Sequence, residues 1–165
     1  GRGGVGPLTT PIHGDFHLGQ VLVASADAYI IDFEGEPARP LQERRRKASP
    51  LRDVAGLLRS FDYAAATVLD PKNLIANRVS PGRRERLVAR LREGAEQAFL
   101  ASYREAVADV PGMAGDGLLD FFLVEKAAYE VAYEAANRPA WLAIPMSGLV
   151  RVTPRLLAMM ARSEV

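Results

Sequence analysis

The residues with the clearest chemical potential lie in the segment 13–20, HGDFHLGQ, and in the acidic motif that follows it. Asp15 and Gln20 belong to this segment, and a short apolar run then leads to Asp32 and Glu34. Phosphoryl transfer needs a carboxylate that positions or deprotonates the attacking hydroxyl, together with metal ions held on the phosphates. Asp15 fits the first role. Gln20, Asp32 and Glu34 supply the hard oxygen donors that Mg²⁺ prefers. The pattern therefore predicts a phosphoryl-transfer site.

The two histidines of the chain, His13 and His17, allow two other interpretations. A spacing of four would place both on one face of a helix as metal ligands, but Gly14 and Gly19 argue against a helix here. Alternatively, the segment makes only the turn hydrogen bonds that Asp and His commonly make. The second acidic motif nearby favours the catalytic interpretation, with His13 anchoring the loop by hydrogen bonding.

A β-hairpin is expected to bring the two motifs together. Residues 20–24 and 29–33 are β-branched and aliphatic runs, and the segment 24–27 between them reads as a turn. The first strand begins where the Asp15 loop ends, and the second delivers Asp32 and Glu34. The two polar motifs should therefore lie side by side.

The rest of the chain is predicted to be helical. Ser49-Pro50 and Ser80-Pro81 are start signals, and further helices are expected over 116–137 and over 146–160, with a kink at Pro154. The helix after Pro50 should bury Leu51, Val54, Leu57, Leu58, Phe61 and Ala65, with Arg52, Asp53 and Arg59 elsewhere. The helix over 82–107 should bury Leu87, Leu91, Ala95, Ala98 and Tyr103. The expected fold class is mainly α with a small β-hairpin.

Composition narrows the functional classes. The chain has 165 residues, 48% of them hydrophobic, which suits one domain. Its 21 basic and 20 acidic residues leave a net charge of +1, so no global field would draw it to nucleic acid or to a membrane surface. It has no cysteine, no apolar run long enough to span a bilayer and no signal peptide. We therefore expect a cytoplasmic protein.

The first ten residues read as a flexible linker or a truncated start. Gly1, Gly3 and Gly6 match the spacing of a nucleotide-binding turn, but no strand precedes them and Pro7 follows at once. The chain also begins without methionine and reaches its strongest motif within a few residues. The expected division is a linker over 1–10 and a functional lobe over 11–165.

These motifs carry a family resemblance. The pattern H-G-D-x-x-x-x-Q followed by I-D-F-E resembles the aminoglycoside-phosphotransferase-like kinases, which are relatives of the protein kinases. Blocks over 40–47, 49–55, 59–63, 125–130 and 137–141 are similar to the actinobacterial maltokinases. The resemblance implies that the chain is the C-terminal lobe of a protein-kinase-like α+β fold. It also implies an enzyme that uses ATP and Mg²⁺ to convert maltose to maltose 1-phosphate.

The resemblance also implies roles for individual residues. Asp15 would be the catalytic base, and Asp32 the principal metal ligand with Glu34 assisting. Gln20 would be a metal ligand at a position where many relatives have asparagine. Asp53 can simply favour the helix start through the dipole, whereas the resemblance suggests that it braces the catalytic loop.

A candidate acceptor site lies on the helix over 116–137. Lys126, Tyr129, Glu130, Tyr133 and Asn137 recur at helical spacing as one polar and aromatic stripe. The alternative is ordinary surface amphipathicity, but the lone tryptophan directly after Asn-Arg-Pro-Ala favours a sugar site. Its expected members are His17, Glu130, Tyr133, Glu134, Asn137, Arg138 and Trp141.

Kinases of this kind also need an N-terminal lobe that holds the nucleotide, and no segment of these residues reads as one. Two hypotheses therefore stand. The first is the catalytic half of a sugar kinase acting on maltose, or on glucosamine, another sugar or an aminoglycoside. The second is a noncatalytic interaction module. The basic run 44–47 is either a solvated loop or an anchor for a phosphate or for the core of the lobe.

Overall fold

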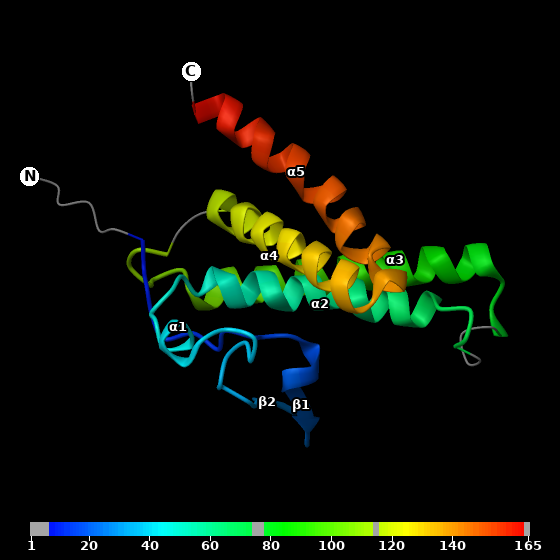
Figure 1. The fold of residues 1–165 in the computed structure, drawn as a ribbon, viewed down its shortest axis with the longest axis horizontal. Coiled ribbons are helices and arrows are strands. Elements are labelled where there is room, and N and C mark those ends of the chain that lie inside the picture. Colours follow the sequence, from blue (N-terminus) through cyan, green and yellow to red (C-terminus); the bar gives the residue numbers. More distant parts are fainter. Residues whose placement is uncertain (1–6, 74–77, 114–115, 164–165) are drawn as a thin grey trace, which may run out of the picture.

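The computed structural model describes residues 7–73, 78–113 and 116–163, and it is mainly helical with one two-stranded hairpin (Figure 1). No helix in these ranges is both long enough and apolar enough to cross a membrane. The elements, in chain order, are η1 (Leu18–Gln20), β1 (Val21–Ala24), β2 (Asp27–Ile30), α1 (Leu41–Arg44), α2 (Leu51–Leu69), α3 (Pro81–Ala106), α4 (Asp116–Asn137), η3 (Pro139–Trp141) and α5 (Ala143–Ser163).

The hairpin is confirmed but is shorter than the sequence suggested. Its strands are antiparallel, and the register pairs Val21 with Ile30 and Ala24 with Asp27. Ser25 and Ala26 form the turn with φ angles of 51° and 68°. Two residues with positive φ match the right-handed twist of the strands, so the tight turn allows the second strand to begin at Asp27 rather than at residue 29.

Helix α2 starts at the predicted place and forms the centre of the molecule. Ser49 Oγ accepts a hydrogen bond from the amide of Leu51 at 3.3 Å. The apolar face packs against α4 and α5, and the buried core consists of Leu51, Val54, Ala55, Leu58, Leu119, Phe122, Leu123 and Val152. The helical spacing of apolar residues therefore predicted this face correctly.

Arg59 is the exception on α2, because the prediction placed it away from the buried face and only 1% of its surface is exposed. Its guanidinium pairs with Asp62 on the same helix and with Glu130 on α4. Arg92 of α3 and Arg151 of α5 also contact Asp62. A buried charge requires partners of opposite sign, and the surrounding helices provide them.

The predicted buried face of α3 is confirmed at Tyr103 but is wrong by about one residue at Leu87 and Leu91. Leu87 is 43% exposed and Leu91 is 74% exposed, whereas Val88 is buried. Phe99 and Tyr103 pack against the core from the same helix. Arg92 also faces the interior from α3, where it contacts Asp62. The spacing of apolar residues cannot predict that a charged side chain points inward.

The remaining boundaries differ little from expectation. Helix α4 has the predicted bounds, whereas α5 begins at Ala143 and continues through Pro154. The backbone amide of Leu8 donates a hydrogen bond to the carbonyl oxygen of Gly112, and Thr10 forms an isolated antiparallel β-bridge with Ala48. Residues 1–6 of the expected linker lie outside the described ranges. In Figure 1 the hairpin and α1 lie on one side of α2, while α4 and α5 cover the other.

Candidate active site

Asp53 holds the segment predicted as the catalytic loop against the start of α2. Its Oδ2 accepts the backbone N–H of His13 at 2.7 Å, and its Oδ1 accepts that of Gly14 at 2.9 Å. Hydrogen bonds to a charged acceptor are stronger than those between neutral groups. Because Asp53 lies in the first turn of α2, the helix fixes the backbone immediately before Asp15.

His13 is buried and joins this loop to the end of β2. Its Nε2 lies 2.8 Å from the carbonyl oxygen of Ile31, and its Nδ1 accepts the amide of Asp15 at 3.3 Å. This network assigns the neutral tautomer in which Nε2–H is the donor. The ring also packs against Phe16 and Phe33, with centroid separations of 5.4 and 4.9 Å. The two sequence motifs are thus joined by one imidazole.

Two glycines allow close backbone approach around Asp15. Gly14 has a φ of +81°, and a Cβ there would lie 3.2 Å from the Cα of Gly35. Gly56 of α2 faces the loop, and a Cβ there would lie 2.6 Å from the carbonyl oxygen of Phe16. Gly19 leaves room for the His17 imidazole, because a Cβ there would lie 2.8 Å from the ring.

On the hairpin side, Gln20 and Asp32 meet. The Gln20 amide nitrogen donates to Asp32 Oδ2 at 3.0 Å, and Asp32 has a φ of 64°. Glu34 is exposed, and its backbone carbonyl accepts from Arg44. Within the described ranges, no three His, Cys, Asp or Glu side chains gather as a metal-binding group. The structure therefore brings together two of the three expected donors. A metal ligand role for Gln20 would need its amide to turn so that the oxygen faces the ion.

Asp15 opens into a pocket of about 500 Å³ between the loop, α2 and α4, which we call the acceptor pocket. The Asp15 side chain is 23% exposed, and His17 Nε2 lies 3.9 Å from its Oδ2. His17 Nδ1 accepts the amide of Gly19 at 3.0 Å. The other side chains around this pocket are Phe16, Leu18, Glu36, Ser60, Tyr63, Ala64, Lys126, Tyr129, Glu130, Tyr133, Glu134 and Arg138.

Glu130 forms part of the pocket wall although it is largely buried. Arg59 Nε donates to its Oε2 at 2.8 Å. Burial raises the pKa of the Glu130 carboxyl, and the charges of Arg59 and Lys126 offset part of that rise. Arg59 in turn is shared with Asp62, so the negative charge at the pocket wall is coupled to the cluster that joins α2, α3 and α5.

Glu134 is the second buried carboxylate of the wall, with 1% of its surface exposed. Tyr63 donates its hydroxyl to Glu134 Oε1 at 3.0 Å, and Arg138 binds both carboxylate oxygens at 2.6 and 2.9 Å. Burial, followed by the charge of Glu130, raises the pKa of Tyr63, which keeps the phenol protonated as a donor. The Arg138 guanidinium also lies over the rings of Tyr133 and Trp141.

The structure separates the predicted acceptor residues into two groups. His17, Glu130, Tyr133, Glu134 and Arg138 all line the acceptor pocket. Asn137 is exposed and donates to the carbonyl of Tyr133, while Trp141 stacks on Tyr63 at a centroid separation of 6.0 Å. Neither of these two residues lines the pocket. Both instead support the chain where α4 ends.

Sequence reasoning missed the contribution of α2 to this pocket. Ser60 and Tyr63 both line it, yet on the sequence they belong to a helix assigned to the core. Their polar groups in a largely apolar helix were the available signal. Lys126 and Tyr129, which were noted only as part of the α4 stripe, also line the pocket.

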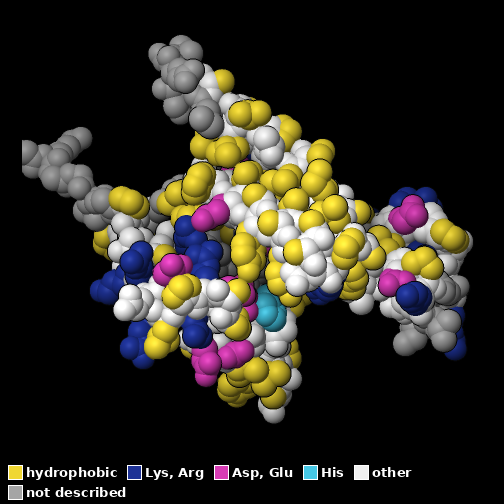
Figure 2. Space-filling view, in the orientation of Figure 1, with side chains coloured by type: hydrophobic (Ala, Val, Ile, Leu, Met, Phe, Trp, Pro, Cys, Tyr) yellow, Lys and Arg dark blue, Asp and Glu magenta, His cyan; other side chains and the backbone are white. Residues whose placement is uncertain are grey.

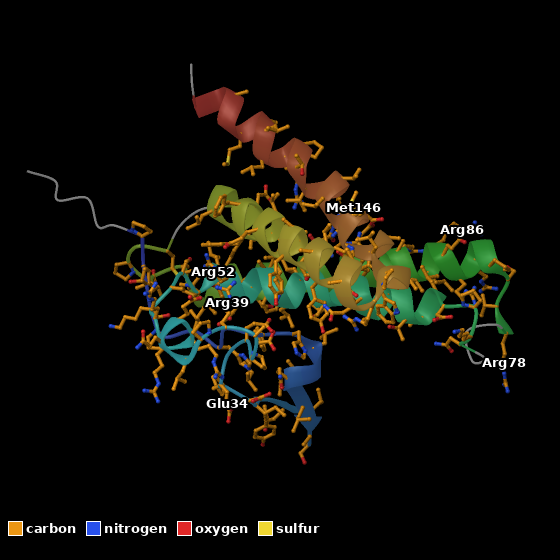
Figure 3. All side chains as sticks on the ribbon, viewed as in Figure 1. Glu34, Arg39, Arg52, Arg78, Arg86 and Met146 are labelled. Atoms are coloured by element: carbon orange, nitrogen blue, oxygen red, sulfur yellow. The ribbon has the colours of Figure 1, made fainter. Side chains whose placement is uncertain are left out.

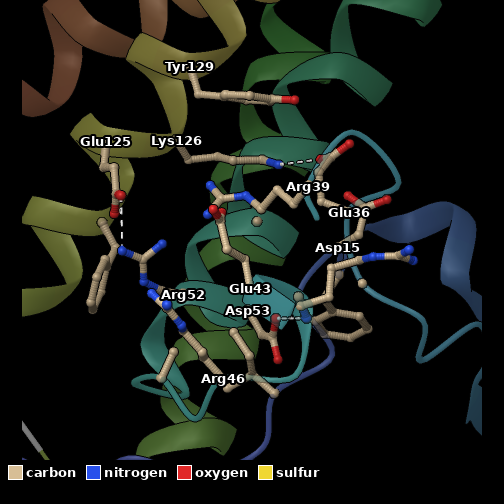
Figure 4. Close-up of a pocket in the computed structure, with 18 of the residues that line it drawn as sticks. Asp15, Glu36, Arg39, Glu43, Arg46, Arg52, Asp53, Glu125, Lys126 and Tyr129 are labelled. Atoms are coloured by element: carbon tan, nitrogen blue, oxygen red, sulfur yellow. Dashed lines mark hydrogen bonds and ion pairs between the residues drawn. The ribbon is translucent and has the colours of Figure 1, made fainter. Parts of the chain in front are cut away.

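A second pocket, of about 290 Å³, lies on the other side of Asp15 and is shown in Figure 4. We call it the basic pocket, because six arginine or lysine side chains line it, against the five carboxylates of Asp15, Glu36, Glu43, Asp53 and Glu125. It shares Asp15, Phe16, Glu36, Gly56, Lys126 and Tyr129 with the acceptor pocket. The six basic residues are Arg39, Arg44, Arg46, Lys47, Arg52 and Lys126.

Comparison with known proteins finds relatives of similar sequence. The sequence is 28% identical over 148 residues to the glucosamine kinase of Streptacidiphilus jiangxiensis, covering 88% of this chain. It is 26% identical over 139 residues to the glucosamine kinase of Mycolicibacterium smegmatis (strain ATCC 700084 / mc(2)155), covering 83% of the chain. This chain's homologues are glucosamine kinases. No protein-family model matches the sequence.

Solved structures give the same result. A glucosamine kinase in complex with glucosamine, ADP and inorganic phosphate matches with a TM-score of 0.72 and 28% identity, over 90% of this chain and 36% of that one. Glucosamine kinase crystal form A matches with a TM-score of 0.73 over 91% of this chain and 36% of that one. The fold is therefore similar to about a third of these glucosamine kinase structures.

The chain matches only part of each relative, so the activity of the whole relative is not shown for this chain. This chain spans 32% and 33% of the length of the two curated relatives. The likeness supports a relationship to sugar kinases of the phosphotransferase type. The more specific expectation of a maltokinase is not shown by these comparisons, which favour the glucosamine alternative instead.

Proposed function

We propose that this chain is the acceptor- and metal-binding lobe of an ATP-dependent sugar kinase whose acceptor is glucosamine. The observation that carries the proposal is the arrangement around Asp15. Asp53 and His13 fix its loop, and the acceptor pocket places two buried carboxylates, Glu130 and Glu134, in the same cavity. The glucosamine kinases similar to this chain support the same substrate class.

The electrostatics of the acceptor pocket favour an amino sugar over a neutral one. Asp15, Glu36, Glu130 and Glu134 provide four carboxylates, against Lys126 and Arg138 as the basic side chains. Arg138 is already bound to Glu134, and Lys126 Nζ lies 4.0 Å from Glu36. A protonated amino group gains from such surroundings, because electrostatic interactions are stronger in a partly buried site. Maltose would bring no positive charge.

Within this proposal the residues take distinct roles. Asp15 accepts the proton of the attacking hydroxyl, and Asp53 and His13 hold its backbone in place. Asp32, with Gln20 beside it, would hold Mg²⁺, an ion that takes one or two carboxylates and completes its shell with water and phosphate oxygens. The metal would neutralise charge on the transferring phosphate. ATP would also need contacts from an N-terminal lobe, which the described residues do not provide.

The test is a phosphorylation assay of this chain in its full-length context, with ATP and either glucosamine, maltose or an aminoglycoside. Glucosamine should stimulate ATP consumption most. Asp15→Asn should lower turnover by about 10² to 10⁴, the usual contribution of a general base. Asp27→Asn, at the hairpin turn, is the matched control and should keep the wild-type rate.

Three results would count against the proposal. Preference for maltose would reinstate the maltokinase hypothesis, and an Asp15→Asn enzyme with near wild-type turnover would refute the role of Asp15. Absence of turnover with every acceptor would favour a noncatalytic module. Calorimetric titration of glucosamine into the chain itself then separates failed binding from failed catalysis.

A further inference from the structure

The structure divides the basic run 44–47, whose role the sequence leaves open. Arg44, Arg46 and Lys47 line the basic pocket, whereas Arg45 does not. Arg39 lines the same pocket from the preceding loop. Figure 2 shows Lys and Arg side chains gathered over the α1 end of the molecule, and in Figure 3 Arg78 lies at the opposite end. Three of the four residues in the run therefore belong to one cavity rather than to a uniformly solvated loop.

Part of the charge in the basic pocket is already paired. Arg52 Nη2 donates to Glu125 Oε1 at 2.9 Å, and its guanidinium lies 4.9 Å from the centre of the Phe122 ring. Lys126 Nζ lies 4.0 Å from Glu36 Oε2. The Asp53 carboxylate is occupied by the two amides of the catalytic loop. These groups form the fixed wall of the cavity.

The remaining basic side chains are uncommitted. Arg39, Arg46 and Lys47 are exposed at the mouth of the cavity that they line, and they form no ion pair with any described residue. Arg44 Nη1 donates to the carbonyl of Glu34 at 3.1 Å, but its Nε is buried without a hydrogen-bond partner in the described structure. Buried donors are normally satisfied. A ligand with several acceptor oxygens would satisfy the Arg44 Nε and would add charge-assisted hydrogen bonds to the exposed cations.

We propose that the basic pocket binds a compact oxyanion of the phosphate class directly beside Asp15. A phosphate group offers several acceptor oxygens that match the fork of a guanidinium, and four arginines line the wall. A cavity of about 290 Å³ lies at the small end of ligand sites. It therefore suits a phosphate with little attached to it. The site adjoins the acceptor pocket but does not depend on the identity of the sugar.

Glu43 allows a test in which a substitution strengthens oxyanion binding as well as one in which a substitution weakens it. It lines the basic pocket and forms no ion pair with a described residue, so its carboxylate would repel a bound oxyanion (Figure 4). Removing it should tighten binding, whereas removing Arg46 should weaken it. Arg45 is the matched control, because it lies in the same basic run and outside the cavity.

The experiment is calorimetric titration of inorganic phosphate into the full chain at low ionic strength, with EDTA present to exclude metal-dependent binding at Asp32. Wild type should bind phosphate saturably. Arg46→Gln should weaken binding about twofold to fivefold, as expected for one exposed charge contact. Glu43→Gln should tighten binding by a similar factor, and Arg45→Gln should match wild type.

Two results would overturn the proposal: absence of saturable phosphate binding, or equal weakening by Arg45→Gln and Arg46→Gln, which would indicate a diffuse surface effect. A second arm uses glucosamine 6-phosphate. If it binds more tightly than phosphate and displaces glucosamine, the oxyanion is carried on a sugar. If it binds no better and phosphate binds together with glucosamine, the oxyanion is free. Both outcomes support the shared chemistry, and neither requires the proposed kinase activity.

Discussion

Arg59 Nε lies 2.8 Å from Glu130 Oε2, although the two residues are 71 positions apart and belong to different helices. Arg59 is 1% exposed, so this contact lies almost entirely out of water. It joins the carboxylate that lines the acceptor pocket to the ion cluster around Asp62. The same contact therefore serves the packing of α2 on α4 and the charge of the candidate site.

Arg59→Leu should destabilise the fold by about 3 to 5 kcal/mol, because it leaves the carboxylates of Glu130 and Asp62 buried without their central partner. Urea unfolding followed by circular dichroism measures the loss. The matched control is Arg155→Leu, which removes an exposed interhelical pair with Asp120 and should cost less than about 1 kcal/mol. Equal losses in the two variants would show that the buried pair has no special weight.

Gly56→Ala should disturb the loop that carries Asp15 from the side of α2. The added methyl group would lie 2.6 Å from the carbonyl oxygen of Phe16, and a backbone atom cannot rotate away as a side chain can. Overpacking of this kind costs about 1 to 3 kcal/mol. The change should also weaken glucosamine binding, because Phe16 adjoins Asp15.

The control for this substitution is Gly94→Ala on α3, where a Cβ would meet no atom within 4 Å. Replacing glycine by alanine in a helix interior stabilises by about 0.5 to 1 kcal/mol. Thermal unfolding should therefore move in opposite directions for the two variants. A stabilised Gly56→Ala protein with normal glucosamine binding would contradict the close approach of α2 to the loop.

Local patterns predicted the elements well because each depends on neighbouring residues. Ser49 and Pro50 mark the start of α2, and α4 has the expected bounds. The inward side chains of Arg59 and Arg92 could not be predicted in this way. Their burial depends on partners on other helices, which no periodicity records.

In the candidate site, too, the local motifs could be predicted from the sequence, whereas contacts between distant elements could not. The types and spacing of His13, Asp15 and Asp32 predict phosphoryl-transfer chemistry, and the structure joins the two loops through the His13 imidazole. The acceptor residues were harder to select, because a helical stripe does not show which of its members face a cavity. Trp141 followed the expected pattern but packs on Tyr63 instead.

Asp53→Asn should loosen the loop that carries Asp15. One carboxamide oxygen can still accept an amide, but the NH₂ group would face the second N–H donor. Loss of one hydrogen bond to a charged group costs about 1.5 to 3 kcal/mol. Hydrogen exchange should accelerate at the amides of His13 and Gly14, and glucosamine turnover in the full-length context should fall.

The matched control for Asp53 is Asp70→Asn. Asp70 Oδ1 also accepts a backbone amide, that of Lys72 at 2.8 Å, but at an exposed position. A single acceptor oxygen is enough there, so stability should change by less than about 0.5 kcal/mol. Unchanged exchange at His13 and Gly14 in Asp53→Asn would show that the loop does not need this carboxylate.

Glu130 should make stability depend on pH with a defined sign. Burial raises its pKa above the ordinary value of 4.5, and Arg59 offsets part of the rise. Because a raised pKa in the folded state favours the protonated form there, this contribution is fully present below the unfolded pKa. It is lost as the pH rises through the folded pKa. Urea unfolding from pH 4 to 8 should therefore show wild type losing stability relative to Glu130→Gln over that window.

The charges that face Glu130 decide how far the window extends. Arg59 and Lys126 lower its pKa, whereas Asp62 raises it. Removing the larger of the two favourable charges, in Arg59→Leu, should raise the folded pKa and extend the pH dependence upward. Comparing Arg59→Leu with the double variant Arg59→Leu/Glu130→Gln isolates that effect from the general loss of stability. A difference between the pairs that does not vary with pH would mean that Glu130 keeps the same pKa in the folded and unfolded states.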